Sequence, residues 1–132
     1  MTFQDKIYIA MEGDSSINSH IDHLFTTRMT DEEEGDIVDE KNDTIVVIHS
    51  EEIDYMDSLD DAGYLQYWSL AVYIGSPKAS SVWALKELIK NYLIVYSGDG
   101  IEAIEFENAT EGYDEDEDIR FSDLRFRALY IP

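Results

Sequence analysis

The sequence contains no cysteine and few basic residues, and both absences restrict what the protein can do. Without cysteine there is no disulfide, no thiol nucleophile and no thiolate metal site, which fits a reducing compartment. Only 9 of the 132 residues are Lys or Arg, so the chain lacks the basic surface with which proteins bind nucleic acid directly. The acidic balance also disfavours binding to an anionic membrane.

Long apolar runs and targeting signals are missing as well. The most apolar stretch, Tyr64 to Ile74, is interrupted by Gln66 and Ser69 and is too short to span a bilayer. The N-terminal residues contain no basic segment followed by an apolar run, so no secretory signal is visible. We therefore expect a cytoplasmic protein, located in the host cytoplasm if a phage encodes it.

No catalytic or phosphate-binding motif is present. The chain has no Gly-x-Ser-x-Gly elbow and no His-Glu-x-x-His pair. Gly98-Asp99-Gly100 lacks the third glycine and the Lys-Ser/Thr pair of a phosphate loop, so it predicts a tight turn. With 30 acidic residues, some carboxylates will lie near each other by chance, and a catalytic pair cannot be argued. We expect no enzymatic activity and no cofactor.

Two groups of side chains could be considered as metal ligands. Asp114 to Asp118 places carboxylates at alternate positions, but Ile119 and Arg125 stand where a calcium loop needs glycine and glutamate. The chain has three histidines, which are His20, His23 and His49. They could bind a transition metal if the fold brings them together. A ligand- or metal-binding domain is therefore an alternative, and we expect no metal by default.

Acidic residues are the abundant feature of the chain. The 30 Asp and Glu give a net charge of −21, and two blocks hold most of them. Residues 31–62 contain 14 acids and one base, and residues 99–118 contain 10 acids and no base. Solubility needs a net charge of magnitude only about 2–8. Halophilic adaptation would spread the acids evenly. The clustering therefore indicates a surface made for a basic partner.

The predicted partner-binding residues are acids of the two blocks and the tyrosines among them. The tyrosines are included because aromatic side chains often anchor protein interfaces. The full prediction is Asp31, Glu32, Glu33, Glu34, Asp36, Glu51, Glu52, Asp54, Tyr55, Asp57, Asp60, Asp61, Tyr113, Asp114, Glu115, Asp116, Glu117 and Asp118.

Periodicity and turn signals predict one α+β domain over residues 1–132. The predicted strands cover residues 6–11, 44–48, 64–74, 93–96, 101–106 and 124–131, and the predicted helices cover about 15–25, 50–59 and 77–92. We expect an antiparallel or mixed sheet with two main helices on one face. A ferredoxin-like β-α-β-β-α-β core with extra strands is the simplest topology of this kind.

The charge pattern leads to a functional hypothesis. Duplex DNA carries about one negative charge per 1.7 Å of axis, so a rigid array of carboxylates can occupy a DNA-binding groove in place of phosphates. In size and charge the chain resembles phage-encoded anti-restriction and anti-CRISPR proteins, and also immunity proteins that neutralise nuclease toxins. The resemblance is compositional and covers no motif.

We therefore expect an acidic inhibitor whose partner is a basic protein, either a nuclease or a CRISPR or restriction component. A toxin immunity protein is the closest alternative, since it would use the same electrostatics. A ligand- or metal-binding domain and a plain structural or assembly domain are two further hypotheses. Composition does not indicate an oligomeric state.

Overall fold

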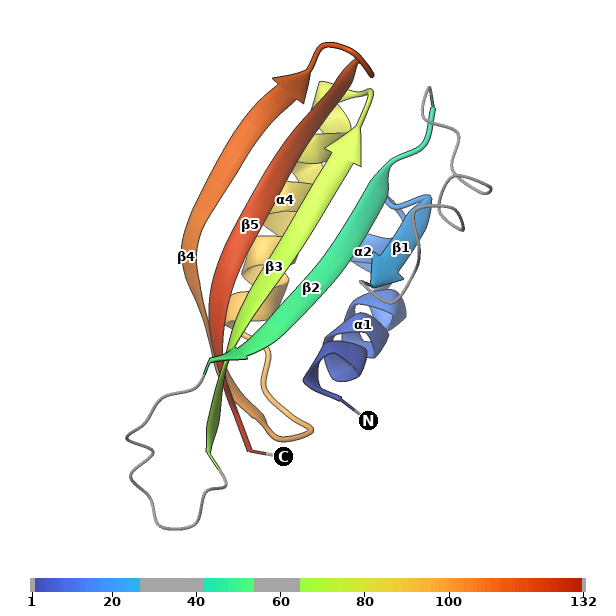
Figure 1. Cartoon of the computed structure of the whole chain (residues 1–132). Helices are drawn as coiled ribbons and strands as arrows, with labels where there is room; N and C mark the ends of the chain where they lie inside the picture. Colours follow the sequence, from blue (N-terminus) through green and yellow to red (C-terminus); the bar gives the residue numbers. More distant parts are fainter. Residues whose placement is uncertain (1, 27–41, 54–64, 132) are drawn as a thin grey trace.

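The computed structural model describes residues 2–26, 42–53 and 65–131 (Figure 1). Within them, a five-stranded mixed sheet is accompanied by three helices, so the predicted α+β class is confirmed. The elements in chain order are α1 (Phe3–Gly13), α2 (Ser15–Asn18), β1 (His23–Thr26), β2 (Ile45–Ile53), β3 (Gln66–Ser76), α4 (Ala79–Ile94), β4 (Ile101–Asp114) and β5 (Ile119–Tyr130).

The strand order in the sheet is β1-β2-β3-β5-β4. β1 runs parallel to β2, and the other neighbours are antiparallel. β5 lies between β3 and β4, so β4 forms one edge of the sheet. The described elements begin with two helices and three strands, which is not the order of the ferredoxin-like core that we expected.

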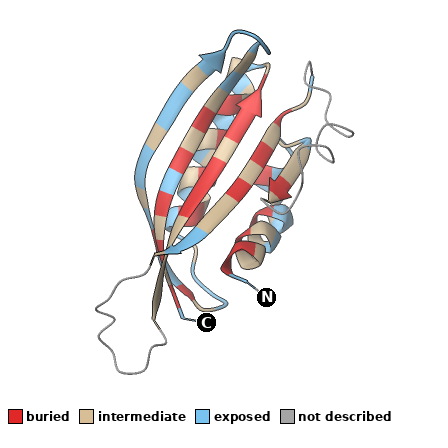
Figure 2. Ribbon diagram, in the orientation of Figure 1, coloured by how far each residue is buried: buried red, intermediate tan, exposed pale blue. Residues whose placement is uncertain are grey.

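The core lies between the sheet and the helices, which cover one face of it (Figure 1). Leu70, Val72 and Ile74 of β3 are fully buried there, as is Phe126 of β5. They pack with the apolar stripes of the helices, which include Phe3, Ile7, Met11, Val82, Leu85 and Ile89. Figure 2 shows buried residues alternating with more exposed ones along β5 and the first part of β2, as expected for a sheet covered on one face. In the central strand β3, residues 70–76 are all buried except Tyr73.

The strand predicted over residues 6–11 is wrong, because these residues belong to α1. Phe3, Ile7 and Met11 are spaced four apart and are all buried, which is a helical stripe. Thr2 and Asp5 form a capping box that satisfies free amides of the first turn. The β-branched and aromatic residues of this segment favour a strand locally, but the buried stripe and the cap favour the helix more.

The predicted helix over residues 15–25 is also mostly wrong. Asp14 is the N-cap of a helix, with its side chain accepting from the Ile17 amide at 3.0 Å. The helix nevertheless ends at Asn18, and His23–Thr26 form β1. Phe25 is buried at a strand position, although its spacing in the sequence predicts a helix.

Two further predictions fail at the boundaries of elements. Ser50 to Ile53 continue β2 and do not begin a helix, while the rest of the predicted helix over 50–59 lies outside the described residues. Leu93 and Ile94 end α4, so the predicted strand over 93–96 is wrong. The turn at Gly98-Asp99-Gly100 is confirmed, since all three residues have positive φ.

The helix predicted over residues 77–92 is confirmed as α4, but it begins later than the sequence indicated. Lys78 is the N-cap residue, and the first helical residue is Ala79. Ser76 is still in β3, where its buried hydroxyl lies 2.8 Å from that of Thr44 and accepts from the Lys78 amide. The strand predicted over 64–74 therefore runs through Gly75, which does not break it.

Candidate protein-binding surface

The structure describes part of the predicted binding surface. Glu51 and Glu52 lie on β2, and Tyr113 to Asp118 form the end of β4 and the turn before β5. The other predicted residues lie outside the described residues: Asp31, Glu32, Glu33, Glu34, Asp36, Asp54, Tyr55, Asp57, Asp60 and Asp61.

The acidic turn after β4 is held in one conformation by its own side chains. The Asp114 carboxylate accepts from the amides of Asp116, at 3.0 Å, and Glu117. The Tyr113 hydroxyl donates to Asp118 at 2.5 Å, and this bond raises the pKa of the tyrosine. Arg120 lies 4.7 Å from the centre of the Tyr113 ring. The turn therefore presents its carboxylates on an ordered support.

The second acidic block is mostly a strand, since β4 covers residues 101–114. Apolar side chains anchor this strand to the core, including Ile101, Ile104 and Phe106. Glu102, Glu105 and Glu107 are exposed, and no ion pair involves them within the described residues. Glu111 differs, because it pairs with Lys86 of α4.

Glu51 and the acidic turn lie at different ends of the sheet, whereas Glu105 of β4 lies in the same row as Glu51. Glu51 pairs with Ser69 of β3, whereas the acidic turn lies beyond the pair formed by Ser76 and Arg120. These rows are seven positions apart along β3, which corresponds to roughly 23 Å along a strand. The carboxylates of β2 and those of the acidic turn are therefore too far apart to form one compact patch.

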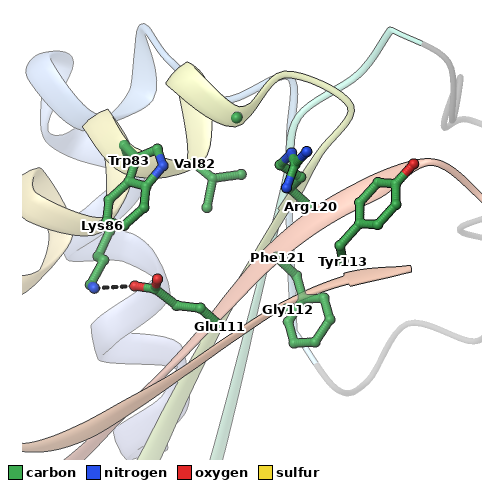
Figure 3. A pocket seen from close by; sticks show the side chains of 9 residues that line it. Val82, Trp83, Lys86, Glu111, Gly112, Tyr113, Arg120 and Phe121 are labelled. Atoms are coloured by element: carbon green, nitrogen blue, oxygen red, sulfur yellow. Dashed lines mark hydrogen bonds and ion pairs between the residues drawn. The ribbon is translucent and has the colours of Figure 1, made fainter. Parts of the chain in front are cut away.

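A shallow groove of about 300 Å³ lies between the start of α4 and the far end of the β4–β5 hairpin. Figure 3 shows Trp83 and Lys86 on one side, Tyr113 and Arg120 on the other, and the Lys86–Glu111 ion pair between the two elements. Trp83 is 57% exposed and Tyr113 is 43% exposed, which is unusual for large aromatic residues. These residues are of the types that dominate protein interfaces.

Sequence reasoning included Tyr113 but missed the rest of this groove. Trp83 follows the first buried residue of α4, Val82, and so falls outside the apolar stripe. An aromatic residue outside the stripe of a predicted helix is a detectable signal. The pairing of Lys86 with Glu111 joins residues 25 positions apart and needed the fold.

The three histidines do not converge on one site. His23 pairs with Asp43 at 2.7 Å, and His49 pairs with Glu51 at 3.2 Å. His20 lies in the turn that follows α2. Among the described residues, no group of three or more His, Asp or Glu side chains is placed to hold a metal ion. In the same part of the chain, no helix has both the length and the apolar character needed to cross a bilayer.

Comparisons with known proteins show a likeness in structure. No protein-family model matches the sequence, and no curated protein matches it. A solved chain from the virion of a native gene transfer agent particle has the same fold, with a TM-score of 0.73. The match covers 98% of this chain and 95% of that chain, at 17% sequence identity. The likeness therefore extends over the whole fold.

Proposed function

We propose that this chain is a structural protein of a phage-like particle and that it acts by binding other proteins of the particle. The observation that carries the proposal is the match to a virion chain over nearly the full length of both proteins. Neither chain has a large unmatched region to which a separate function could be assigned. The proposal requires no catalysis and no cofactor.

The exposed groove supports a role in protein binding. Its aromatic and basic side chains come from α4, β4 and β5, and the Lys86–Glu111 pair joins α4 to β4. The acidic surface is compatible with a particle that handles DNA, because carboxylates repel phosphates and do not trap the nucleic acid as it passes. Both features agree better with assembly than with a ligand pocket.

Deletion of the gene from the strain that carries it tests this proposal. We expect incomplete particles in electron micrographs, restored by the wild-type gene. Complementation with Trp83→Ala and Tyr113→Ala together should restore particles poorly, whereas Glu87→Ala, an exposed change on the same helix, should restore them fully. Complete particles in the deletion strain would contradict the proposal.

The ordered acidic turn favours a second candidate function, inhibition of a nucleic-acid-processing enzyme. Five consecutive acids on a fixed turn are the kind of array that a DNA-mimicking inhibitor needs. The inhibitor would bind the basic groove of a nuclease or of a CRISPR or restriction component. A toxin immunity protein would use the same surface against one cognate nuclease.

Charge reversal in the turn tests this second candidate. Glu115, Asp116 and Glu117 are suitable positions because their carboxylates make no hydrogen bond in the described structure. Changing Glu115 and Glu117 to Lys should abolish salt-sensitive capture of a nuclease, while Glu12 and Glu87 changed to Lys provide a control of equal charge. Equal capture by both variants would reject inhibition through the turn.

A further inference from the structure

The outer edge of β4 is the longest open backbone edge in the described structure. β4 contains 14 residues, and among the described strands it pairs with β5 alone, apart from a bridge between Ile101 and Gly98 at its start. Figure 2 shows that most of its length is exposed. An edge strand presents a row of backbone donors and acceptors to which another strand can pair. The edge at the opposite side of the sheet, β1, has only four residues.

The side chains along this edge restrict which strand can pair there. Glu102, Glu105 and Glu107 are exposed and make no ion pair within the described residues. Glu105 is in register with Arg127 of β5, and the residues between Glu102 and Glu107 on β4 include no base. Like charges directly opposite each other destabilise a pair of strands, whereas opposite charges stabilise it. The edge therefore disfavours an acidic or neutral strand relative to a basic one.

A second copy of β4 is a poor partner for this edge. Pairing two copies would bring the acids of one strand beside those of the other. Two register shifts, between Ile101 and Ala103 and between Phe106 and Asn108, also interrupt the regular ladder. Bulges and charges of this kind are known to prevent edge-to-edge association of identical sheets. The most basic strand of the chain, β5, already pairs on both sides.

We propose that the outer edge of β4 binds an extended, lysine- or arginine-rich segment of another protein, which adds to the sheet as a sixth strand. Backbone hydrogen bonds would supply the pairing, and the three glutamates would select basic side chains beside the edge. The inference stands on the geometry of β4 and does not depend on the proposed role in a particle. It predicts a partner with a basic extended segment in either functional setting.

A peptide in which lysine alternates with threonine over ten residues is a suitable probe. The matched control has the same sequence with N-methyl groups on its four central amides, which keeps the charge and removes the donors that pairing requires. Fluorescence anisotropy of the labelled peptides gives Kd at low and at moderate salt. Hydrogen exchange of the intact protein shows which amides the peptide protects.

We expect the unmodified peptide to bind with an affinity that falls with salt and to slow exchange in β4. The N-methylated peptide should bind at least tenfold more weakly. Glu102→Gln, Glu105→Gln and Glu107→Gln together should weaken binding roughly tenfold, as expected for the loss of several partner charges. The control triple Glu12→Gln, Glu52→Gln and Glu87→Gln has the same net charge and should change Kd less than twofold.

Three results would overturn the inference. They are absence of binding, equal affinity for the two peptides, and protection that lies in other strands. An equal effect of the two glutamine triples would likewise assign binding to the overall charge of the protein and not to this edge. Circular dichroism of both variants confirms that the fold is retained before affinities are compared.

Discussion

The two faces of the sheet differ in what they contribute. On the inner face, Leu70, Val72 and Phe126 are fully buried against α1 and α4. The outer face carries partly exposed aromatic and charged residues: Tyr67, Tyr73, Phe121, Asp123, Arg125 and Arg127. Burial of apolar area is the main stabilising term in folding. The inner face therefore maintains the fold, whereas the outer face and β4 carry the more exposed side chains of the described sheet.

The outer face has a small apolar cluster of its own at one end. The rings of Tyr73 and Phe121 stack with centres 5.8 Å apart. Phe121 is in register with Gly75 on β3 and with Gly112 on β4. Because these glycines have no side chains, the two rings can lie directly over the backbone there. The cluster gives the outer face some local order without a helix to cover it.

The largest effect should come from the inner face. Phe126→Ala removes a fully buried ring whose centre lies 5.5 Å from that of Phe106. We expect a loss of about 3–5 kcal/mol in the free energy of unfolding, as for other buried phenylalanines. Urea unfolding monitored by circular dichroism measures it. A loss below about 1 kcal/mol would show that the inner face is not the main core.

Phe121→Ala makes the same change on the other face of the same strand. Its ring is partly exposed and stacks only on Tyr73 among the described aromatic rings. We expect a loss of about 1 kcal/mol, from the stacking and the smaller burial. The same unfolding experiment applies. A loss equal to that of Phe126→Ala would remove the distinction between the two faces.

Gly112→Ala tests how the outer cluster is packed. A Cβ at this position would lie 2.6 Å from the Phe121 ring, so the ring must move. Without this clash, alanine in place of glycine in a strand should raise the free energy of unfolding by about 0.5–1 kcal/mol. We expect Gly112→Ala to be stabilising only when Phe121 is also alanine. A double-mutant cycle measures the coupling, and additive effects would contradict contact between the two positions.

A smaller effect should appear at alkaline pH. Burial raises the pKa of Tyr92, whose hydroxyl donates to the Ala10 carbonyl at 3.1 Å. A raised pKa in the folded state gives stability that is fully present below the unfolded value of about 10 and is lost as pH rises through the folded value. Between about pH 9 and pH 11, the free energy of unfolding should therefore fall less in Tyr92→Phe than in the wild-type protein. Urea midpoints at both pH values test this, and an identical loss in both proteins would contradict it.

Sequence reasoning succeeded where the apolar period was regular. In β3, Leu70, Val72 and Ile74 alternate along the strand and are fully buried, and the predicted strand is confirmed there. The stripe of α4 was also predicted, because Val82, Leu85 and Ile89 keep a helical spacing. β3 is the central strand of the sheet and α4 is the longest described helix, which explains why the fold class was predicted correctly.

Sequence reasoning failed where the period is interrupted. In β4 the anchoring residues Ile101, Ile104, Phe106 and Ala109 are spaced by three, two and three positions. The two irregular steps coincide with the two register shifts, so a test for strict alternation misses the second half of the strand. The groove at Trp83 was not predicted because it depends on the approach of α4 to the β4–β5 hairpin.

The position of β5 in the sheet also sets the order in which the fold can be completed. β2 can pair with β3 as soon as both have been synthesised, because they are consecutive in sequence and adjacent in the sheet. β4 has no partner until β5 follows it, and β5 must then pair on both sides. During synthesis, the nascent chain therefore exposes one edge of β3 and the apolar residues of β4 until β5 arrives. Aggregation of chains interrupted before β5 is the expected consequence, and the acids along β4 oppose it at the step where the chain is most vulnerable.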